Sequence, residues 1–319
     1  MQYKNIFVTG GTGRIGRHLI KRLVSEGCQV KILTRRDSCQ LIEDDHIQFV
    51  KGDILNQDLI KQEIRGCDYL FHLAVYQNIN DRKKDEFVRV NLEGTKSILN
   101  CSMNSGLKKI VYVSTAMVFE STGNIQRDEN WVQKTFSENN YIQTKIEALE
   151  IVRQAKKIIP IVIVYPSEVI DFNDFSSSLP VGVKKWQKSL WKILGGSIPG
   201  GLRARVGNKN RIINYVAVQD LVEGMIQAAE QGSAGEEYLL CGENIKIVDY
   251  LVKASKRINS RLWPIRIPLF PLKAVSLLGR GIPLSPIIKL ILEHCEMNAC
   301  FSSEKAKKYI GYNQTLRLK

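Results

Sequence analysis

The sequence of 319 residues lacks any apolar run approaching the roughly 18 residues that would indicate a transmembrane helix. Stable membrane insertion is therefore not expected. Its seven cysteines are odd in number and scattered, without a C-x-x-C pair, which argues against a disulfide framework or a zinc site. Only four histidines occur, equally scattered. We therefore expect no metal site.

Acidic residues are fewer than basic ones, and the formal net charge is +14. Such a charge attracts polyanions. However, the Lys and Arg residues are spread along the chain without interleaved aromatic residues, so nucleic-acid binding is not expected. A positive field that draws in an anionic cofactor is a sufficient explanation. The first apolar strand begins close to the N-terminus, which leaves no room for a signal peptide and predicts a cytoplasmic protein.

The opening stretch, residues 4–16, organises the rest of the chain. Residues 6–8 form an apolar run of strand length, and residues 14–26 have helical apolar spacing. Between them lie Gly10, Gly13 and Gly16. In a strand–turn–helix these glycines allow a tight turn, close approach of a pyrophosphate and packing of the helix on the strand. A purely structural turn is the alternative, but the position favours dinucleotide binding.

Further strands follow at 29–34, 47–51, 69–74, 109–113 and 161–164, with helical patterns between them. This alternation predicts an α/β fold with a Rossmann-type doubly wound parallel sheet.

The end of the second strand carries Arg35 and Arg36, where a site for NAD usually has an acidic residue. Paired guanidinium groups suit a 2′-phosphate, so NADP(H) is favoured over NAD(H), with solvated turn charges as the alternative. Asp53 follows the third strand, where it can accept from an adenine amino group or cap the helix from Gln57. His72 lies inside the fourth strand and is interpreted as a satisfied core histidine. A long helix is expected over 87–103.

The fifth strand ends in Ser114 and Thr115, at the sheet edge where ligands bind in such folds. Tyr141 and Lys145 follow, four residues apart on an expected helix, and therefore share one face. A nearby ammonium lowers the pKa of a phenol, which would let Tyr141 exchange a proton with a substrate oxygen. A surface Tyr–Lys pair is the alternative reading.

With these residues in place, the chain resembles the extended short-chain dehydrogenase/reductase family, the NAD-dependent epimerase/dehydratase superfamily. The matching motifs are Thr9–Gly16, Gly52-Asp53, His72–Ala74, Asn91 with Gly94-Thr95, Val113–Thr115, Tyr141-x-x-x-Lys145 and Pro166-Ser167. The second half is similar to the dihydroflavonol-reductase-like branch over 213–225, 235–244 and 301–312. Tyr165 and Glu120 depart from the pattern, at positions expected near the substrate mouth.

The resemblance implies that Tyr141 is the acid/base, Lys145 its partner and Thr115 the hydroxyl that polarises a substrate carbonyl. Pattern and resemblance together give one cofactor site: Gly10, Thr12, Gly13, Arg14, Ile15, Gly16, Arg35, Arg36, Asp53, Ile54, Leu73, Ala74, Asn91, Val113, Ser114, Tyr141, Lys145, Pro166 and Ser167.

Two lobes are expected. Residues 1–170 and 213–241 form the NADP-binding Rossmann domain, and 171–212 and 242–319 form a smaller substrate-binding lobe. The Pro- and Leu-rich segment 262–292 is interpreted as core of that lobe, with a pocket lid or a weak membrane-surface contact as alternatives.

The resulting hypothesis is an NADPH-dependent reductase that transfers a hydride to a ketone or aldehyde of a small, apolar or cyclic substrate. A nucleotide-sugar epimerase or dehydratase with tightly bound NAD(P) is the alternative, and a redox-sensing binding module ranks last. The partner is a small-molecule substrate. The sequence leaves open the substrate's identity, the stereochemistry of transfer and whether a homodimer forms.

Overall fold

The structure is a computed structural model that describes residues 1, 4–35, 44–78, 84–173, 205–206, 208, 210–257, 266–268, 270, 274 and 297–317. Its strands are β1 Asn5–Thr9, β2 Gln29–Thr34, β3 Ile47–Lys51, β4 Tyr69–His72, β5 Lys109–Val113, β6 Ile161–Pro166, β7 Glu168–Ile170, β8 Arg205–Val206, β9 Ile212–Ala217, β10 Glu237–Leu240, β11 Glu243–Lys246 and β12 Arg266–Ile267. Its helices are α1 Arg14–Val24, α2 Gln57–Glu63, α3 Lys84–Phe87, α4 Gly94–Ser102, α5 Asn140–Ala155, α7 Val218–Gln231, α8 Ile247–Arg257 and α11 Glu304–Ile310, with a π-helix, Val88–Glu93, and a 3₁₀ turn, Ala116–Val118.

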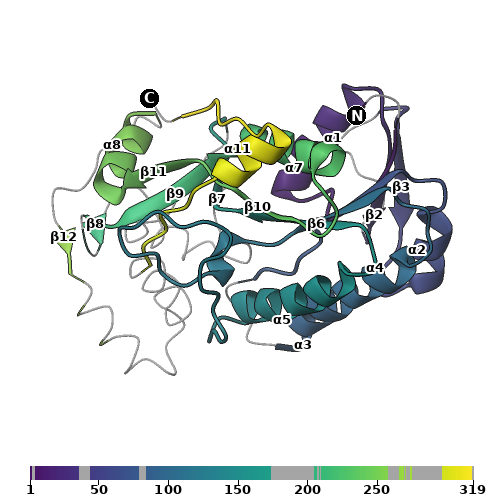
Figure 1. Cartoon of the computed structure of the whole chain (residues 1–319), viewed down its shortest axis with the longest axis horizontal. Coiled ribbons are helices and arrows are strands. Elements are labelled where there is room, and N and C mark those ends of the chain that lie inside the picture. Colours follow the sequence, from purple (N-terminus) through teal and green to yellow (C-terminus); the bar gives the residue numbers. More distant parts are fainter. Residues whose placement is uncertain are drawn as a thin grey trace.

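The central sheet has seven strands in the order β10-β6-β5-β4-β1-β2-β3, and all neighbours run parallel (Figure 1). The strands expected from the sequence account for all of them except β10. The chain winds outward from β1 in both directions, first to β2 and β3 and then to β4, β5 and β6. Ligands bind at such a reversal, outside the carboxyl ends of the strands. The predicted doubly wound fold is confirmed.

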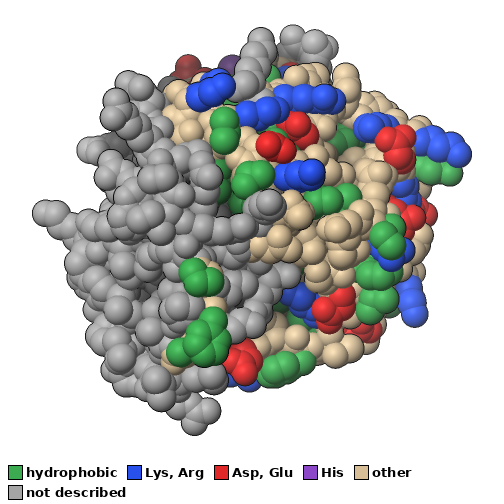
Figure 2. All heavy atoms as spheres, turned by 90° about the vertical axis from the view of Figure 1, so that its left-hand side faces the viewer, with side chains coloured by type: hydrophobic (Ala, Val, Ile, Leu, Met, Phe, Trp, Pro, Cys, Tyr) green, Lys and Arg blue, Asp and Glu red, His purple; other side chains and the backbone are tan. Residues whose placement is uncertain are grey.

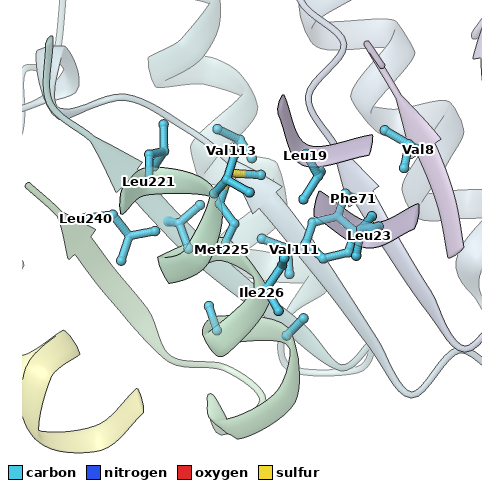
Figure 3. Packing of buried hydrophobic residues seen from close by; sticks show 14 of the residues in the cluster. Val8, Leu19, Leu23, Phe71, Val111, Val113, Leu221, Met225, Ile226 and Leu240 are labelled. Atoms are coloured by element: carbon cyan, nitrogen blue, oxygen red, sulfur yellow. The ribbon is translucent and has the colours of Figure 1, made fainter. Parts of the chain in front are cut away.

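Helices cover both faces of this sheet. Figure 1 shows α2, α4 and α5 on one face and α1, α7 and α11 on the other. Successive strand residues point to opposite faces. Val111 and Val113 of β5 therefore join the cluster under α1 and α7 (Figure 3), whereas Ile110 and Tyr112 join the cluster under α4 and α5. This alternation decides on which side of the sheet each polar tip lies.

A second sheet is built from β7, β9 and β11, with β9 parallel to β7 and antiparallel to β11. A separate apolar cluster lies between this sheet and α8 and includes Phe172, Tyr215, Ile245 and Tyr250. Residues 174–204 and most of 258–296, including nearly all of the segment 262–292, lie outside the described residues. The division into two lobes therefore stays a prediction.

The described C-terminal residues return to the central sheet. Ala306, Ile310 and Tyr312 are buried in the cluster under α7. Beyond them, the Asp220 carboxylate of α7 accepts hydrogen bonds from Thr315 Oγ1 at 2.7 Å and from Leu316 N at 2.9 Å. This part of the expected second lobe thus packs on the face of the central sheet that α7 covers.

The edge strand β10 has side-chain partners along its outer side. Leu239 N donates to the buried Glu129 carboxylate at 2.6 Å. Immediately after the strand, Cys241 N donates to Ser303 Oγ at 3.0 Å, and Ser303 Oγ donates to Cys241 O at 3.1 Å. These contacts occupy backbone groups that an edge strand otherwise presents to solvent.

β10 is also tied to α5 by a cluster of charges. The Glu237 carboxylate accepts from Arg153, from Lys156 Nζ at 2.6 Å and from the phenol of Tyr165. Burial alone would raise the pKa of Glu237, but the three hydrogen bonds and the charge of Arg153 lower it to about 2. Tyr165 is fully buried and its hydroxyl belongs to this cluster. The Tyr165 side chain is thus directed into this cluster, while its backbone lies next to Pro166 at the carboxyl end of β6, and its place at the substrate mouth stays a prediction.

Replacing Glu237 with Gln is expected to destabilise the fold by about 2–3 kcal/mol at pH 7, since a carboxylate with a lowered pKa stabilises the folded state. This contribution is complete above the unfolded pKa near 4.5 and is lost as the pH falls through that value toward about 2. Urea unfolding at pH 7 and at pH 4 measures it. The difference between the two proteins should shrink at pH 4; a constant difference would contradict the assignment.

Candidate active site

The glycine turn joins β1 to α1 and lies against the segment after β4. Gly10 has a φ of +74°, and a Cβ there would lie 2.6 Å from Ala74 N. A Cβ at Gly16 would lie 2.4 Å from Gly10 O. Both glycines are thus required by the geometry, one for the turn and one for packing of the helix on it. α1 begins at Arg14, so the helix N-terminus faces the turn, where an anion is stabilised.

Because the strands of the central sheet are parallel, the residues that follow them share one edge. The turn after β1, Arg35 after β2, Asp53 and Ile54 after β3, Leu73 and Ala74 after β4, Ser114 and Thr115 after β5, and Ser167 after β6 are therefore arranged along this edge. Val113 and Pro166 are the last residues of β5 and β6. Arg36 lies outside the described residues.

Asp53 has a partner that the sequence did not reveal. Its carboxylate accepts from Leu55 N at 3.0 Å and from the Arg89 guanidinium at 2.6 Å. Burial would raise the pKa of Asp53, but these two bonds and the charges of Arg89 and Arg35 lower it. The helix from Gln57 is capped by Asn56, whose side chain accepts from Leu59 N at 3.2 Å. The capping alternative for Asp53 is therefore wrong.

Tyr141 and Thr115 are brought together. The side chain of Asn139 caps α5 by accepting from Tyr141 N at 3.0 Å, and this places Tyr141 in the first turn of the helix. The Thr115 hydroxyl lies near its phenol and favours the ionised form. Burial raises the pKa of Tyr141 to about 12, with a further increase from Glu168, while Thr115 and the charge of Arg14 oppose the shift.

Lys145 is buried one helical turn later. Its ammonium donates to Val113 O at 2.7 Å and to Tyr112 Oη at 3.2 Å. Burial lowers the pKa of Lys145 to about 7. The expected lowering of the Tyr141 pKa by this ammonium is not seen in this structure. Burial is the largest cause of the shift, and two of the ammonium's N–H groups are directed to β5.

Ser114 supports the fit of a ligand at this edge. It is 4% exposed, and its Oγ has no hydrogen-bond partner among the described residues. Buried polar atoms are nearly always paired. An orphaned hydroxyl at the end of β5, beside a glycine turn in which a side chain at Gly13 would lie 3.1 Å from Gly10 O, fits a site that takes a polar ligand.

Asn91 contributes to the site indirectly. Its amide accepts from Tyr76 N at 2.6 Å and donates to Tyr76 O and to Thr144 Oγ1. It therefore ties the segment after β4 to α5. Asn91 lies in the π-helix Val88–Glu93, so the helix expected over 87–103 is present but not regular. π-Helical turns are often found at functional sites.

His72 is a core histidine, as expected. It is 3% exposed and hydrogen-bonded on both ring nitrogens, to Thr9 Oγ1 at 2.7 Å and to Thr95 Oγ1 at 3.1 Å. Burial, with the charge of Lys145 as a smaller cause, lowers its pKa to about 3. The ring is therefore neutral at pH 7. Sequence reasoning missed Tyr112 and Arg89; the one available signal for Tyr112 was a polar tip within an apolar strand.

On the face drawn in Figure 2, basic and acidic side chains lie intermingled over the described part of the molecule. No helix within the described ranges is long and apolar enough to cross a membrane.

Comparison with known proteins gives a consistent family. The model of the NAD-dependent epimerase/dehydratase family matches residues 6–241. A protein of Synechocystis sp. provisionally named dihydroflavonol 4-reductase is 28% identical over 328 residues, covering 97% of this chain and 90% of the relative. The 4-hydroxy-2-methyl-3-oxo-4-farnesyl-3,4-dihydroquinoline-1-oxide ketoreductase of Stigmatella aurantiaca is 26% identical over 319 residues, covering 96% and 91%.

Among solved structures, DesIV, the dTDP-glucose 4,6-dehydratase of Streptomyces venezuelae with NAD and TYD bound, has a TM-score of 0.74 at 18% identity and covers 98% of this chain and 92% of its own. That likeness shows the shared fold. The fold, the glycine turn and the family match agree. The chain belongs to the NAD-dependent epimerase/dehydratase family, with a dihydroflavonol-reductase-like relative, and is an NAD(P)-dependent oxidoreductase of the extended short-chain dehydrogenase/reductase type.

Proposed function

We propose that the chain is an NADPH-dependent reductase acting on a ketone or aldehyde of a small, apolar or cyclic substrate. The observation that carries this proposal is the proximity of the Tyr141 phenol and the Thr115 hydroxyl at the carboxyl edge of the sheet, with Lys145 one turn away. Two hydroxyls held together there can both contact one carbonyl oxygen. This is the geometry that a proton donor and a polarising group need.

The residues of the site would divide the work. Burial keeps Tyr141 protonated at neutral pH, so it is suited to donate its proton to the substrate oxygen. Thr115 donates a hydrogen bond to the same oxygen and orients it. Lys145 holds the ribose hydroxyls of the cofactor, and Ser114 lines the nicotinamide side. When bound, NADPH supplies the hydride at C4 of its nicotinamide.

One relative and the composition of the sequence support an apolar, cyclic substrate. The Stigmatella ketoreductase is named for a ring ketone with a farnesyl chain. In the sequence, the expected second lobe of this chain has an amphipathic stretch with Trp186, Trp191 and Leu194 on its apolar side, which would suit an apolar substrate better than a sugar. A cyclic ketone with an apolar substituent is therefore the first substrate to test.

The preference for NADP(H) rests on Arg35 and Arg36. Arg35 is exposed after β2, and its charge contributes to lowering the pKa of Asp53 after β3, so the two lie on the same side of the site. A 2′-phosphate bound there would receive charge-assisted hydrogen bonds.

Replacing Arg35 and Arg36 together with Ala is expected to weaken NADPH binding about a hundredfold and NADH binding by less than about threefold, since only NADPH carries the 2′-phosphate. Titration calorimetry with each cofactor measures this. The control is Lys61→Ala with Arg65→Ala, which removes the same charge at α2 and the turn after it and should change both affinities little. Equal losses for both cofactors would count against the 2′-phosphate role.

The alternative is a nucleotide-sugar epimerase or dehydratase, which the family match favours by its description. Ala116 and Met117 follow Thr115 in the sequence, so the next two positions supply no additional base, and the carboxylate whose charge acts on Tyr141 is that of Glu168. The deciding experiment incubates the purified protein with NADPH and a panel of cyclic ketones, and separately with UDP-sugars. Consumption of NADPH in proportion to alcohol formed supports the reductase. Conversion of UDP-sugars without net consumption of cofactor would establish the alternative.

A further inference from the structure

A row of buried polar side chains leads from Lys145 back to the glycine turn. Lys145 Nζ is 3.2 Å from Tyr112 Oη, and the Thr95 hydroxyl lies near that of Tyr112 and acts on its pKa. Thr95 Oγ1 is 3.1 Å from His72 Nε2, and His72 Nδ1 is 2.7 Å from Thr9 Oγ1. All five side chains are at most 8% exposed. This row of side chains thus crosses from α5 through β5, α4 and β4 to β1.

A donor and an acceptor can be assigned consistently to the hydrogen bonds in this row of side chains. Thr95 Oγ1 donates to Asn91 O at 2.7 Å, so it accepts from His72 Nε2–H and keeps a lone pair for the Tyr112 hydroxyl. His72 is neutral with its proton on Nε2, and its Nδ1 accepts from the Thr9 hydroxyl. The Tyr112 oxygen accepts from the Lys145 ammonium, which leaves the Tyr112 O–H free to point toward Thr95.

An ammonium has three N–H groups. In Lys145, one donates to Val113 O and one to Tyr112 Oη, and the ammonium lies 4.5 Å from the centre of the Tyr112 ring. We propose that Tyr112, held by Thr95 and His72, is a positioning residue that fixes the Lys145 ammonium with one N–H directed to the cofactor and Tyr141. This inference rests on the proposed function and extends it to a residue outside the Tyr–Lys–Thr set.

The groups that can titrate around Lys145 come from three elements. Tyr112 stands on β5, His72 on β4, and Tyr141 on α5 itself. Glu168 and Arg14 act on Tyr141. Of these, Tyr112 bonds the ammonium directly, so removing its hydroxyl disfavours the charged form of Lys145.

The main test is Tyr112→Phe, which keeps the ring and removes only the acceptor. We expect kcat for carbonyl reduction to fall about tenfold, and the alkaline limb of the pH profile to move down by about one pH unit. The matched control is Tyr165→Phe on the neighbouring strand β6. The hydroxyl of Tyr165 bonds Glu237 and Arg153 and not Lys145. This variant is expected to lower Tm without moving the pH profile. An unmoved profile in Tyr112→Phe would overturn the proposal.

Thr95, in the middle of this row of side chains, provides a second pair of variants. Thr95→Val keeps the shape and deprives Tyr112 and His72 of their acceptor, so it should shift the alkaline limb in the same direction as Tyr112→Phe. Thr95→Ser keeps the hydroxyl and should restore the profile of the unaltered protein. If Thr95→Ser and Thr95→Val behave alike, only packing is at work and the proposal fails.

A measurement without cofactor or substrate separates this inference from the proposed function. In protein labelled with [13C]lysine, the NMR titration of Lys145, assigned by its loss in Lys145→Met, should move to lower pH in Tyr112→Phe and stay in place in Tyr165→Phe. If the unaltered enzyme reduces no carbonyl, the proposed function is wrong. The Lys145 titration still decides whether Tyr112 positions the ammonium. An unchanged Lys145 titration would overturn the positioning role whatever the activity.

Discussion

Tyr141→Phe is expected to lower kcat for carbonyl reduction by about a thousandfold, since a positioned general acid contributes about 10²–10⁴ to the rate. The substitution removes one hydroxyl and keeps the ring. Thr115 Oγ1 still accepts from Met117 N at 3.2 Å, so the local structure has a reason to persist. NADPH affinity should change by less than about threefold, because the phenol acts on the substrate oxygen.

Steady-state kinetics on the best ketone of the panel, with NADPH affinity measured by fluorescence titration, test this prediction. Tyr309→Phe is the matched control, because Tyr309 is 58% exposed on α11 and is not among the site residues. It should retain full activity. Undiminished turnover by Tyr141→Phe would remove the acid/base assignment and with it the proposed mechanism.

The second large effect is expected for Gly10→Ala. The added methyl group would lie 2.6 Å from backbone atoms of Leu73 and Ala74, which cannot move without disturbing the end of β4. It would also place Ala at a φ of +74°, which costs about 1–2 kcal/mol by itself. We expect a stability loss of several kcal/mol and NADPH binding weakened by about a hundredfold or more, because the turn that approaches the pyrophosphate is displaced.

Gly66→Ala isolates the collision from the backbone strain. Gly66 has the same φ of +74°, and nothing lies within 4 Å of the Cβ that would be added. It should therefore lose only the about 1–2 kcal/mol of the left-handed conformation and keep its cofactor affinity. Urea unfolding and cofactor titration on both variants measure the two effects. Similar results for Gly10→Ala and Gly66→Ala would show that the turn tolerates displacement.

The architecture was predictable because it is encoded by local patterns. Apolar strand runs, helical spacing and the glycines after β1 each lie within a few residues, and parallel topology follows from their alternation. The proximity of Tyr141 to Lys145 follows from helical spacing. That of Tyr141 to Thr115 follows from β5 and α5 being adjacent in the fold.

The contacts that no local pattern encodes could not be predicted. Arg89 reaches Asp53 across 36 residues, and Tyr112 meets Lys145 across 33. Both depend on the side-chain directions that packing selects. The pKa of Tyr141 was misjudged for a related reason, because helical spacing gives the distance to a neighbouring charge but not the burial that outweighs it.

The partners of β10 bear on how copies of this chain could associate. Continuation of the sheet into a second molecule would require Leu239 to release Glu129, and Cys241 to release Ser303. The Glu129 carboxylate would then be buried in the interface without a hydrogen-bond donor, and the free-energy cost of this would exceed the gain from a few new backbone hydrogen bonds. Intermolecular strand pairing, the first step toward fibrous aggregates, is therefore disfavoured along this border of the molecule.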